Sequence, residues 1–300
     1  MRNEKMHDEE WDIDAPLVRR LVSGQLEQWA DLPIERVSST GTDNALFRLG
    51  EDMVVRLPRI QSAGEKGDKE HRWLPRFAPL LPLSIPLPLA AGRPAAGYPW
   101  HWSVHRWLEG ENATADRLDD PVQAAQALGE FVAALHRIDP GGGPAPGDHN
   151  GFRGDPLATR DRDVRQAIAV LGAQIDTAAT TRVWQAALDS PAWEGPPVWV
   201  HGDLHAGNLL ADRGRLCAVI DFGCLGVGDP AVDVMAAWTF LPPPARDVFR
   251  TAVDVDDATW ARGRGWALSM ALIALPYYTD RNPPFAADAR RWLGEVLADP

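Results

Sequence analysis

Only two cysteines, Cys217 and Cys224, occur among the 300 residues of the sequence. Two are too few for a disulfide framework, and they have no metal-ligand spacing with further cysteines. A chain of this length that is 45% hydrophobic and 24% charged has the composition of an ordinary globular protein with a substantial core.

Long uninterrupted hydrophobic runs are also missing. The longest apolar stretch, residues 77–91, is interrupted by Pro79, Pro82, Pro86 and Pro88, and a membrane-spanning helix does not readily accommodate that density of proline. Residues 1–11 are charged and polar, and they lack the apolar segment and small-residue cleavage site of a secretory signal. We therefore expect a cytoplasmic protein with no membrane partner.

Positive charge is in deficit, with 42 acidic residues against 30 basic residues and a formal net charge of −12. An acidic surface repels polyanions, so nucleic acid is disfavoured as a partner. The same surface suits a cationic small molecule. Many proteins are acidic for solubility alone, so this charge is a bias and not an assignment.

The most informative segment of the chain is residues 201–223. It contains the sequence HGDLHAGN, which ends at Asn208, and then, after an apolar run, IDFG with Asp221 as its second residue. Asp203 and Asn208 are separated by four residues, and Asp221 follows a strand-like segment. A phosphoryl-transfer site carries a base and two magnesium ligands in this order.

The chemistry of phosphoryl transfer explains these residue types. Divalent cations must neutralise the charge of the transferred group, and Mg²⁺ prefers oxygen donors such as those of Asn208 and Asp221. The acceptor hydroxyl must be oriented and must lose its proton, and Asp203 is placed to act as that base. His201 is expected to organise the loop.

Two other interpretations of the motif stay open. His201, Asp203 and His205 alternate like the ligands of a zinc or iron hydrolase, although Asn208 and Asp221 make that class a remote alternative. The remaining histidines are His7, His71, His101, His105, His136 and His149, and the one pair at a spacing of four, His101 and His105, falls in a stretch whose sequence predicts a strand. A nucleotide-binding module without catalysis is the other alternative.

The motif blocks, followed by Gly-Asp-Pro at residues 228–230 and by Asp233, resemble the aminoglycoside phosphotransferase family of small-molecule kinases. The resemblance covers nearly the whole chain, but its specific motifs lie mainly in residues 198–233. It implies an α+β, two-lobed protein-kinase-like fold with an antiparallel sheet in the small lobe and a larger, mainly helical lobe. It also implies ATP and Mg²⁺ as cofactors, with GTP as an alternative nucleotide.

The pattern of elements fits such lobes. Asp14 is a candidate cap for a first helix, and an apolar stripe predicts a helix over residues 122–137. We predict a nucleotide-binding lobe over residues 1–104, a hinge over 105–109 and a catalytic and acceptor-binding lobe over 110–300. Asp229 and Asp233 are expected to support the structure, either as helix caps or as braces of the catalytic loop.

The resemblance places the nucleotide against several small-lobe residues. A predicted hairpin joins residues 34–37 to 45–49, and its polar tip is expected over the phosphates. The family usually has a lysine at the position of Arg56, whose expected carboxylate partner is Glu70, with Glu65 as the second choice. The hinge backbone should hold the adenine. The candidate nucleotide-binding residues are Ser39, Thr40, Gly41, Arg56, Glu70, Arg106 and Leu108.

The acceptor should be a small molecule. Asp229 and a predicted helix over 231–240 follow Gly223 almost at once, which leaves no long activation segment for a polypeptide substrate. The resemblance implies an aminoglycoside-type antibiotic, while a macrolide, a peptide antibiotic and a choline-like or amino-alcohol metabolite stay open. Candidate pocket residues are Trp238, Trp266 and Tyr277. We expect a monomer or a weak homodimer.

Overall fold

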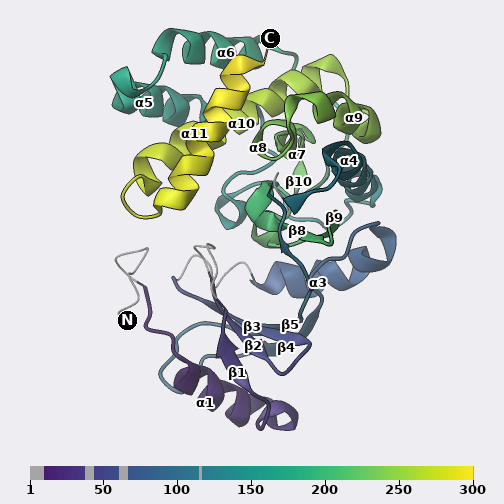
Figure 1. Cartoon of the computed structure of the whole chain (residues 1–300), viewed down its shortest axis with the longest axis vertical. Coiled ribbons are helices and arrows are strands. Elements are labelled where there is room, and N and C mark those ends of the chain that lie inside the picture. Colours follow the sequence, from purple (N-terminus) through teal and green to yellow (C-terminus); the bar gives the residue numbers. More distant parts are fainter. Residues whose placement is uncertain (1–9, 38–43, 61–66, 115–116, 300) are drawn as a thin grey trace.

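The computed structural model describes residues 10–37, 44–60, 67–114 and 117–299. Two lobes lie one above the other, a small one with a sheet and a larger one built mainly of helices (Figure 1). Each lobe has its own hydrophobic core. The predicted α+β architecture is therefore present.

The small lobe is an antiparallel sheet covered by one helix. The strands lie in the order β1-β2-β3-β5-β4, with bounds β1 (Ile34–Arg36), β2 (Asn44–Leu49), β3 (Met53–Pro58), β4 (Pro88–Gly92) and β5 (Trp102–Arg106). Alternate residues of β2 are buried because successive side chains point to opposite faces. The predicted pairing of β1 with β2 is confirmed. The hairpin tip lies outside the described residues.

The helix α1 (Ala15–Gln25) packs its apolar stripe on this sheet. Asp14 caps it as predicted, because the Asp14 carboxylate accepts the Leu17 N–H at 2.8 Å. This bond satisfies one of the backbone donors that the first helical turn leaves unpaired.

The helix α3 (Gly67–Phe77) belongs to the small lobe by sequence order but packs against the large lobe. Trp73 and Phe77 are buried, and their ring centroids lie 4.6 and 4.9 Å from that of Trp199. Both residues are part of the larger hydrophobic core. The lobes therefore share an interface through α3, and the lobe boundary at residue 104 stays a prediction.

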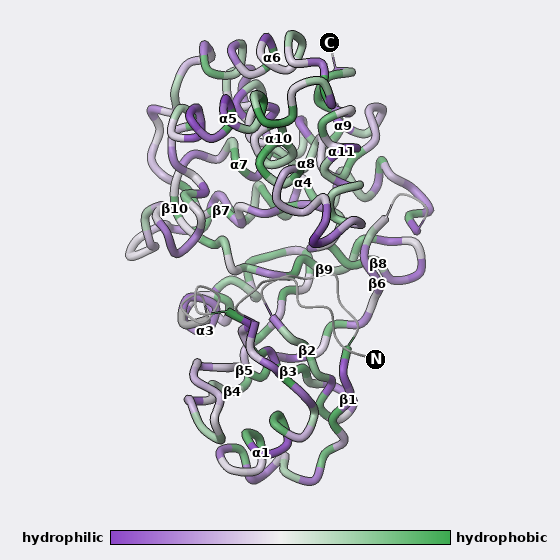
Figure 2. The backbone as a smooth tube through the Cα atoms, turned by 90° about the vertical axis from the view of Figure 1, so that its left-hand side faces the viewer, coloured by the Kyte–Doolittle hydropathy of each residue, from purple (hydrophilic) through white to green (hydrophobic). Residues whose placement is uncertain are grey.

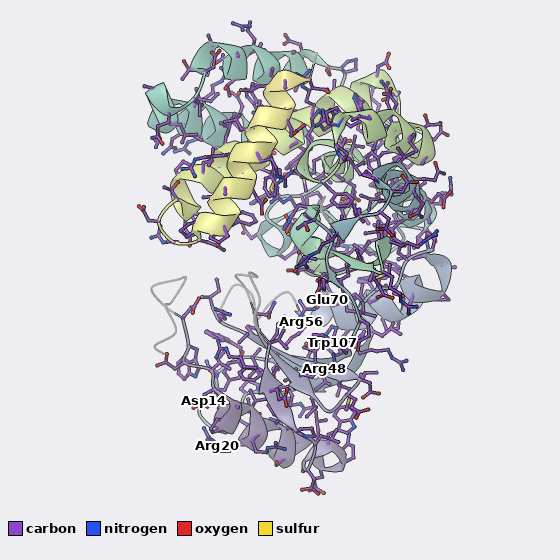
Figure 3. The ribbon with its side chains drawn as sticks, in the orientation of Figure 1. Asp14, Arg20, Arg48, Arg56, Glu70 and Trp107 are labelled. Carbon is purple, nitrogen blue, oxygen red and sulfur yellow. The ribbon has the colours of Figure 1, made fainter. Side chains whose placement is uncertain are left out.

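At the end of β5 the chain passes from one lobe to the other. The Trp107 N–H donates to the Asp52 carbonyl oxygen at 2.7 Å. The Arg48 guanidinium lies 4.1 Å from the centre of the Trp107 ring. Arg48 also pairs with Glu109 at 3.1 Å. Figure 3 shows Arg48 and Trp107 together at this crossing. These contacts fix the segment that we predict to be the hinge.

The large lobe is built around α10 (Asp257–Tyr278), a long helix that is buried over most of its length. The other long helices of this lobe are α4 (Pro121–Arg137), α5 (Asp161–Leu171), α6 (Thr177–Asp189), α9 (Pro243–Val253) and α11 (Pro283–Ala298). The helix predicted over 122–137 is therefore confirmed as α4. Hydrophobic colouring concentrates on α10 near the centre of this lobe (Figure 2). Among the described helices, none is both long and apolar enough to cross a membrane.

Short elements of the large lobe carry the motif residues. Their bounds are β6 (Glu111–Asn112), β7 (Val198–Val200), β8 (Leu209–Asp212), β9 (Arg215–Val219), β10 (Gly226–Gly228), α7 (Ala231–Val234) and α8 (Ala236–Thr239). Strand β7 pairs with β10, and β8 pairs with β6 and β9. These small sheets place β7 and β9 on the side of the lobe that faces the small lobe (Figure 2).

His105 on β5 should make the stability of the protein depend on pH. Its ring is fully buried, and neither ring nitrogen has a hydrogen-bond partner. Burial lowers the pKa of His105 well below its ordinary value, and the charges of Arg56 and His71 act in the same direction. The folded protein thus binds fewer protons here than the unfolded chain, so stability is lost as the pH falls below about 6.5.

We expect His105→Leu to reduce this acid sensitivity. One excluded proton changes the free energy of unfolding by at most about 1.4 kcal/mol per pH unit, and the apolar side chain leaves no unpaired nitrogen. Urea unfolding at pH 7.5, 6.0 and 5.0 should give a steeper loss for the wild type than for the variant. Parallel curves would show that His105 is not the responsible group.

Candidate functional site

The loop that follows β7 is held in place by a buried aspartate. The Asp233 carboxylate on α7 accepts the N–H groups of His201 at 2.9 Å and Gly202 at 2.7 Å. His136 Nε2 lies 3.3 Å from the same carboxylate. Gly202 has a φ of 81°, a conformation that glycine adopts without strain. Asp233 therefore fixes the backbone that carries Asp203.

His201 is used entirely within the loop. Its Nδ1 accepts the Asp203 N–H at 3.2 Å, and its Nε2 lies 3.0 Å from the Ile220 carbonyl oxygen, to which it donates. The ring packs edge-on against Phe222, with centroids 4.6 Å apart. Since both ring nitrogens are engaged with the backbone, His201 fits a loop-organising role and not that of a metal ligand in a hydrolase.

Asp203 lies against Asn208 and His205. The Asn208 amide nitrogen donates to the Asp203 carbonyl oxygen at 2.8 Å and to its carboxylate at 3.0 Å. His205 Nδ1 accepts the Gly207 N–H at 3.1 Å, so the ring proton is on Nε2, which lies 3.6 Å from the Asp203 carboxylate. None of these hydrogen bonds uses the Asn208 amide oxygen, so this oxygen is available as a metal ligand.

The electrostatic surroundings keep Asp203 ionised. Burial acts to raise the pKa of this carboxyl, but the hydrogen bond from His205 and the positive charge of Arg153 outweigh burial, and His201 acts in the same direction, so the pKa lies below its ordinary value. Arg153 Nη2 is 3.8 Å from the carboxylate, whose side chain is 23% exposed. A carboxylate that is charged and reachable can accept a hydrogen bond from a substrate hydroxyl.

Asp221 joins this site from the end of β9. The Ile220 N–H donates to the Asn208 carbonyl oxygen at 2.9 Å, which brings the two loops side by side. Asp221 adopts a left-handed conformation with φ of 61°, and its side chain is 42% exposed. The structure thus brings Asp203, Asn208 and Asp221 together. Their carboxylate and amide oxygens are the donors that Mg²⁺ prefers, so the residues fit that ion.

The small lobe contributes an ion pair to the same place. Arg56 Nη1 lies 2.7 Å from the Glu70 carboxylate, and the two side chains are 13% and 4% exposed. Arg56 Nη2 lies 3.8 Å from Asp221 of the large lobe. Figure 3 shows Arg56 and Glu70 at the face of the small lobe that meets the large lobe. The predicted choice of Glu70 as the partner of Arg56 is confirmed.

The other predicted nucleotide-binding residues are less well defined by the structure. Ser39, Thr40 and Gly41 lie outside the described residues. The Arg106 N–H donates to the Leu87 carbonyl oxygen at 2.8 Å, so this backbone donor is already used within the small lobe. Leu108 is half-buried in the segment after β5.

Known proteins share the sequence pattern of this chain. The model of the phosphotransferase enzyme family matches residues 34–266. The chain belongs to this family. The uncharacterized protein YcbJ of Bacillus subtilis (strain 168) is 25% identical over an alignment of 254 residues that covers 77% of each chain.

Solved structures of phosphotransferases share the fold. The GDP complex of wild-type aminoglycoside 2'-phosphotransferase-IIIa has a TM-score of 0.73 at 18% identity and covers 96% of this chain and 99% of that one. Macrolide 2'-phosphotransferase MphH from Brachybacterium faecium has a TM-score of 0.57 at 25% identity and covers 94% and 98%. The predicted family and its kinase-like fold are confirmed.

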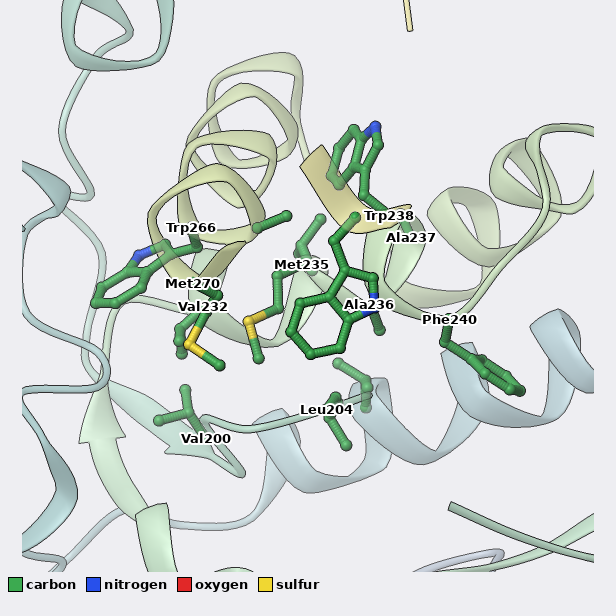
Figure 4. Close-up of a cluster of buried hydrophobic side chains, with 14 of the residues drawn as sticks. Val200, Leu204, Val232, Met235, Ala236, Ala237, Trp238, Phe240, Trp266 and Met270 are labelled. Atoms are coloured by element: carbon green, nitrogen blue, oxygen red, sulfur yellow. The ribbon is translucent and has the colours of Figure 1, made fainter. Parts of the chain in front are cut away.

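The tryptophans that we expected in the acceptor pocket of this phosphotransferase are core residues. Trp238 and Trp266 are completely buried, and Figure 4 shows them in a cluster of apolar side chains from α7, α8 and α10. They cannot form a wall that is open to an acceptor in this conformation, because α10 is covered by neighbouring helices over most of its length. Tyr277 is 41% exposed.

Aromatic residues that sequence reasoning missed connect Tyr277 to the catalytic loop. Successive ring centroids lie 4.7 Å apart for Tyr277 and Tyr278, 4.8 Å for Tyr278 and Phe285, and 5.7 Å for Phe285 and His205. We call these four rings the aromatic row. The row ends at His205, which lies beside Asp203. In the sequence, the position of His205 two residues after Asp203 would have pointed to the acceptor pocket better than the tryptophans did.

Asp229 supports the fold of the phosphotransferase in two ways. Its carboxylate accepts the N–H of Ala231, the first residue of α7, at 2.9 Å. It also binds the Arg262 guanidinium through both oxygens, at 2.9 and 3.1 Å. Both side chains are almost completely buried. Sequence reasoning missed Arg262, which lies 33 residues from its partner.

Proposed function

We propose that this phosphotransferase moves the γ-phosphate of ATP to a hydroxyl group of a small molecule. The proposal rests on the proximity of three side chains, Asp203 and Asn208 from the loop after β7 and Asp221 from the end of β9. The Asp203 carboxylate lies 3.0 Å from the Asn208 amide, and the Asn208 backbone is bonded to the residue before Asp221. A base beside two oxygen donors is the minimal equipment for phosphoryl transfer.

Each residue of the site has its own role in the proposed reaction. Asp203 would orient the acceptor hydroxyl in line with the phosphorus and take its proton as the new bond forms. Arg56, held by Glu70, would contact phosphate oxygens, and its planar fork can reach two oxygens at once. Bound Mg²⁺, held by Asn208 and Asp221, would neutralise the charge of the phosphates.

A small hydroxyl compound is the acceptor that the chain favours. Only β10 and a turn separate Gly223 from α7, so there is no platform for a polypeptide. The net charge of −12 favours a polycation. Structures with the same fold include a kanamycin complex and a gentamicin complex of aminoglycoside phosphotransferases. We therefore propose an aminoglycoside-type acceptor first.

A macrolide-type acceptor is the second candidate, and the aromatic row favours it. The row runs from an exposed tyrosine to His205, next to the proposed base. Aromatic side chains offer a large apolar contact area to a ring of an acceptor. The likeness to a macrolide 2'-phosphotransferase is consistent with this alternative.

A nucleotide-consumption screen tests the proposal. The purified protein is incubated with ATP or GTP and Mg²⁺ in the presence of an aminoglycoside, a macrolide, a peptide antibiotic or an amino alcohol, and the products are analysed by mass spectrometry. We expect one class to gain 80 Da per molecule, the mass of one added phosphoryl group. Tight nucleotide binding with no transfer to any acceptor would favour a binding module, and hydrolysis without nucleotide would favour a metallohydrolase.

A further inference from the structure

Lys69, the residue before Glu70 on α3, makes a cluster of contacts with the large lobe. Its Nζ lies 2.9 Å from His149 Nδ1 and 3.1 Å from the His149 carbonyl oxygen. It also lies 3.0 Å from the Gly223 carbonyl oxygen and 3.1 Å from that of Leu225. One ammonium thus joins α3 to two separate segments of the other lobe.

All four neighbours act as acceptors. His149 Nε2 lies 2.8 Å from the Ala145 carbonyl oxygen and donates to it, so His149 Nδ1 is free of a proton and accepts from Lys69. A compact ammonium can direct its donors to acceptors that converge from several sides, whereas a guanidinium is planar. Lys69 is one of only three lysines among thirty basic residues. A lysine therefore occupies this site in a chain whose basic residues are nearly all arginine.

The two ends of α3 are fixed to the large lobe by different means. Trp73 and Phe77 pack on Trp199 near the helix C-terminus, and Lys69 holds the N-terminal turn. Glu70, which binds Arg56 at 2.7 Å, lies next to Lys69. On the other side, Gly223 comes two residues after Asp221 and donates its N–H to the Asp221 carboxylate at 3.3 Å.

We infer that Lys69 is a positioning residue that sets the Arg56–Glu70 pair and the Asp221 turn relative to each other before any nucleotide binds. An outward movement of α3 would break the contacts of the ammonium and would separate Glu70 from Arg56. The role of Lys69 in catalysis rests on the proposed function, because it acts through the nucleotide site. The mechanical coupling does not depend on it.

Hydrogen–deuterium exchange of the full-length, nucleotide-free protein tests the coupling. The variants are Lys69→Met, which removes the donors, and Lys69→Arg, which keeps the charge. Arg20→Met is the control, because Arg20 is an exposed cation on α1, the other helix of the small lobe. We expect both Lys69 variants to exchange faster in α3 and in residues 221–225 together, by about tenfold or more. The control should leave both segments unchanged.

Nucleotide affinity is the second readout. We expect Lys69→Met to weaken binding of Mg²⁺–ATP and to raise its KM by about tenfold, with the acceptor KM changed less than about twofold. A purely structural loss would affect both KM values and the melting temperature. The inference is overturned if exchange rises in only one of the two segments, or if nucleotide affinity stays within about twofold of the wild type.

The exchange experiment also separates this inference from the proposed function. If the wild type binds no nucleotide, the proposed function fails, but the joint change in exchange of α3 and residues 221–225 still reports whether Lys69 couples them. If the wild type is an active kinase and the exchange pattern is unchanged in both Lys69 variants, only the coupling fails. If Lys69→Met does not fold, Lys69→Arg decides.

Discussion

Replacing Asp203 by asparagine is expected to lower kcat by about 10³-fold while leaving the Kd for Mg²⁺–ATP within about threefold of the wild type. The amide keeps the size of the side chain and can still approach the Asn208 amide through its oxygen, but it cannot take a proton from the acceptor hydroxyl. Steady-state kinetics with the acceptor found in the screen and fluorescence titration with a nucleotide analogue measure the two quantities.

The matched control for this change is Asp212→Asn. Asp212 ends β8, its side chain is 49% exposed, and it pairs with the neighbouring exposed Arg213. Its removal should leave kcat unchanged. If Asp203→Asn retains more than about a tenth of the wild-type kcat, Asp203 is not the general base. If it loses nucleotide binding as well, the carboxylate contributes to the metal site and not to deprotonation.

The parts of the site that could be read from the sequence are those whose partners are close in the chain or joined by a strand. Asp203 and Asn208 are five residues apart and share a loop, and the hydrogen bond between them is a local contact. The Asp14 cap is set by the three residues that follow it. Local spacing determines such geometry, because few backbone conformations are available to a short segment.

The residues that sequence reasoning missed depend on packing between distant segments. Lys69 and Gly223 are 154 residues apart, and no pattern near Lys69 distinguishes it from a solvated lysine on a charged helix. Trp238 and Trp266 look like ligand-stacking residues in a one-dimensional sequence. They are buried in the hydrophobic core of the large lobe, among side chains from distant parts of the chain, which is a property of the tertiary structure.

The choice of Glu70 as the partner of Arg56 depends on both local spacing and long-range packing. Glu65, the second choice, lies outside the described residues. Helical periodicity fixes which residues of α3 share a face, but the position of the helix over the sheet is fixed by Trp73 and Phe77 in the other lobe. Glu70 is 3% exposed and meets Arg56. The motif could suggest this ion pair, and only the packing of α3 could select the residue.

Arg262→Met should strongly destabilise the protein. The Arg262 guanidinium binds both Asp229 oxygens, and the two side chains are 4% and 5% exposed. Removing the arginine leaves a buried carboxylate without its counter-ion, which costs about 3–5 kcal/mol in the free energy of unfolding. Urea unfolding followed by circular dichroism measures the change.

Two further variants identify the cause of that loss. Arg262→Met combined with Asp229→Asn removes the uncompensated charge and keeps an oxygen for the Ala231 N–H, so at least half of the lost stability should return. Arg165→Met breaks an exposed pair with Asp161, whose side chains are 47% and 37% exposed, and should cost less than about 1 kcal/mol. If the double variant is no more stable than Arg262→Met, the loss comes from the packing of the arginine side chain and not from the buried charge of Asp229.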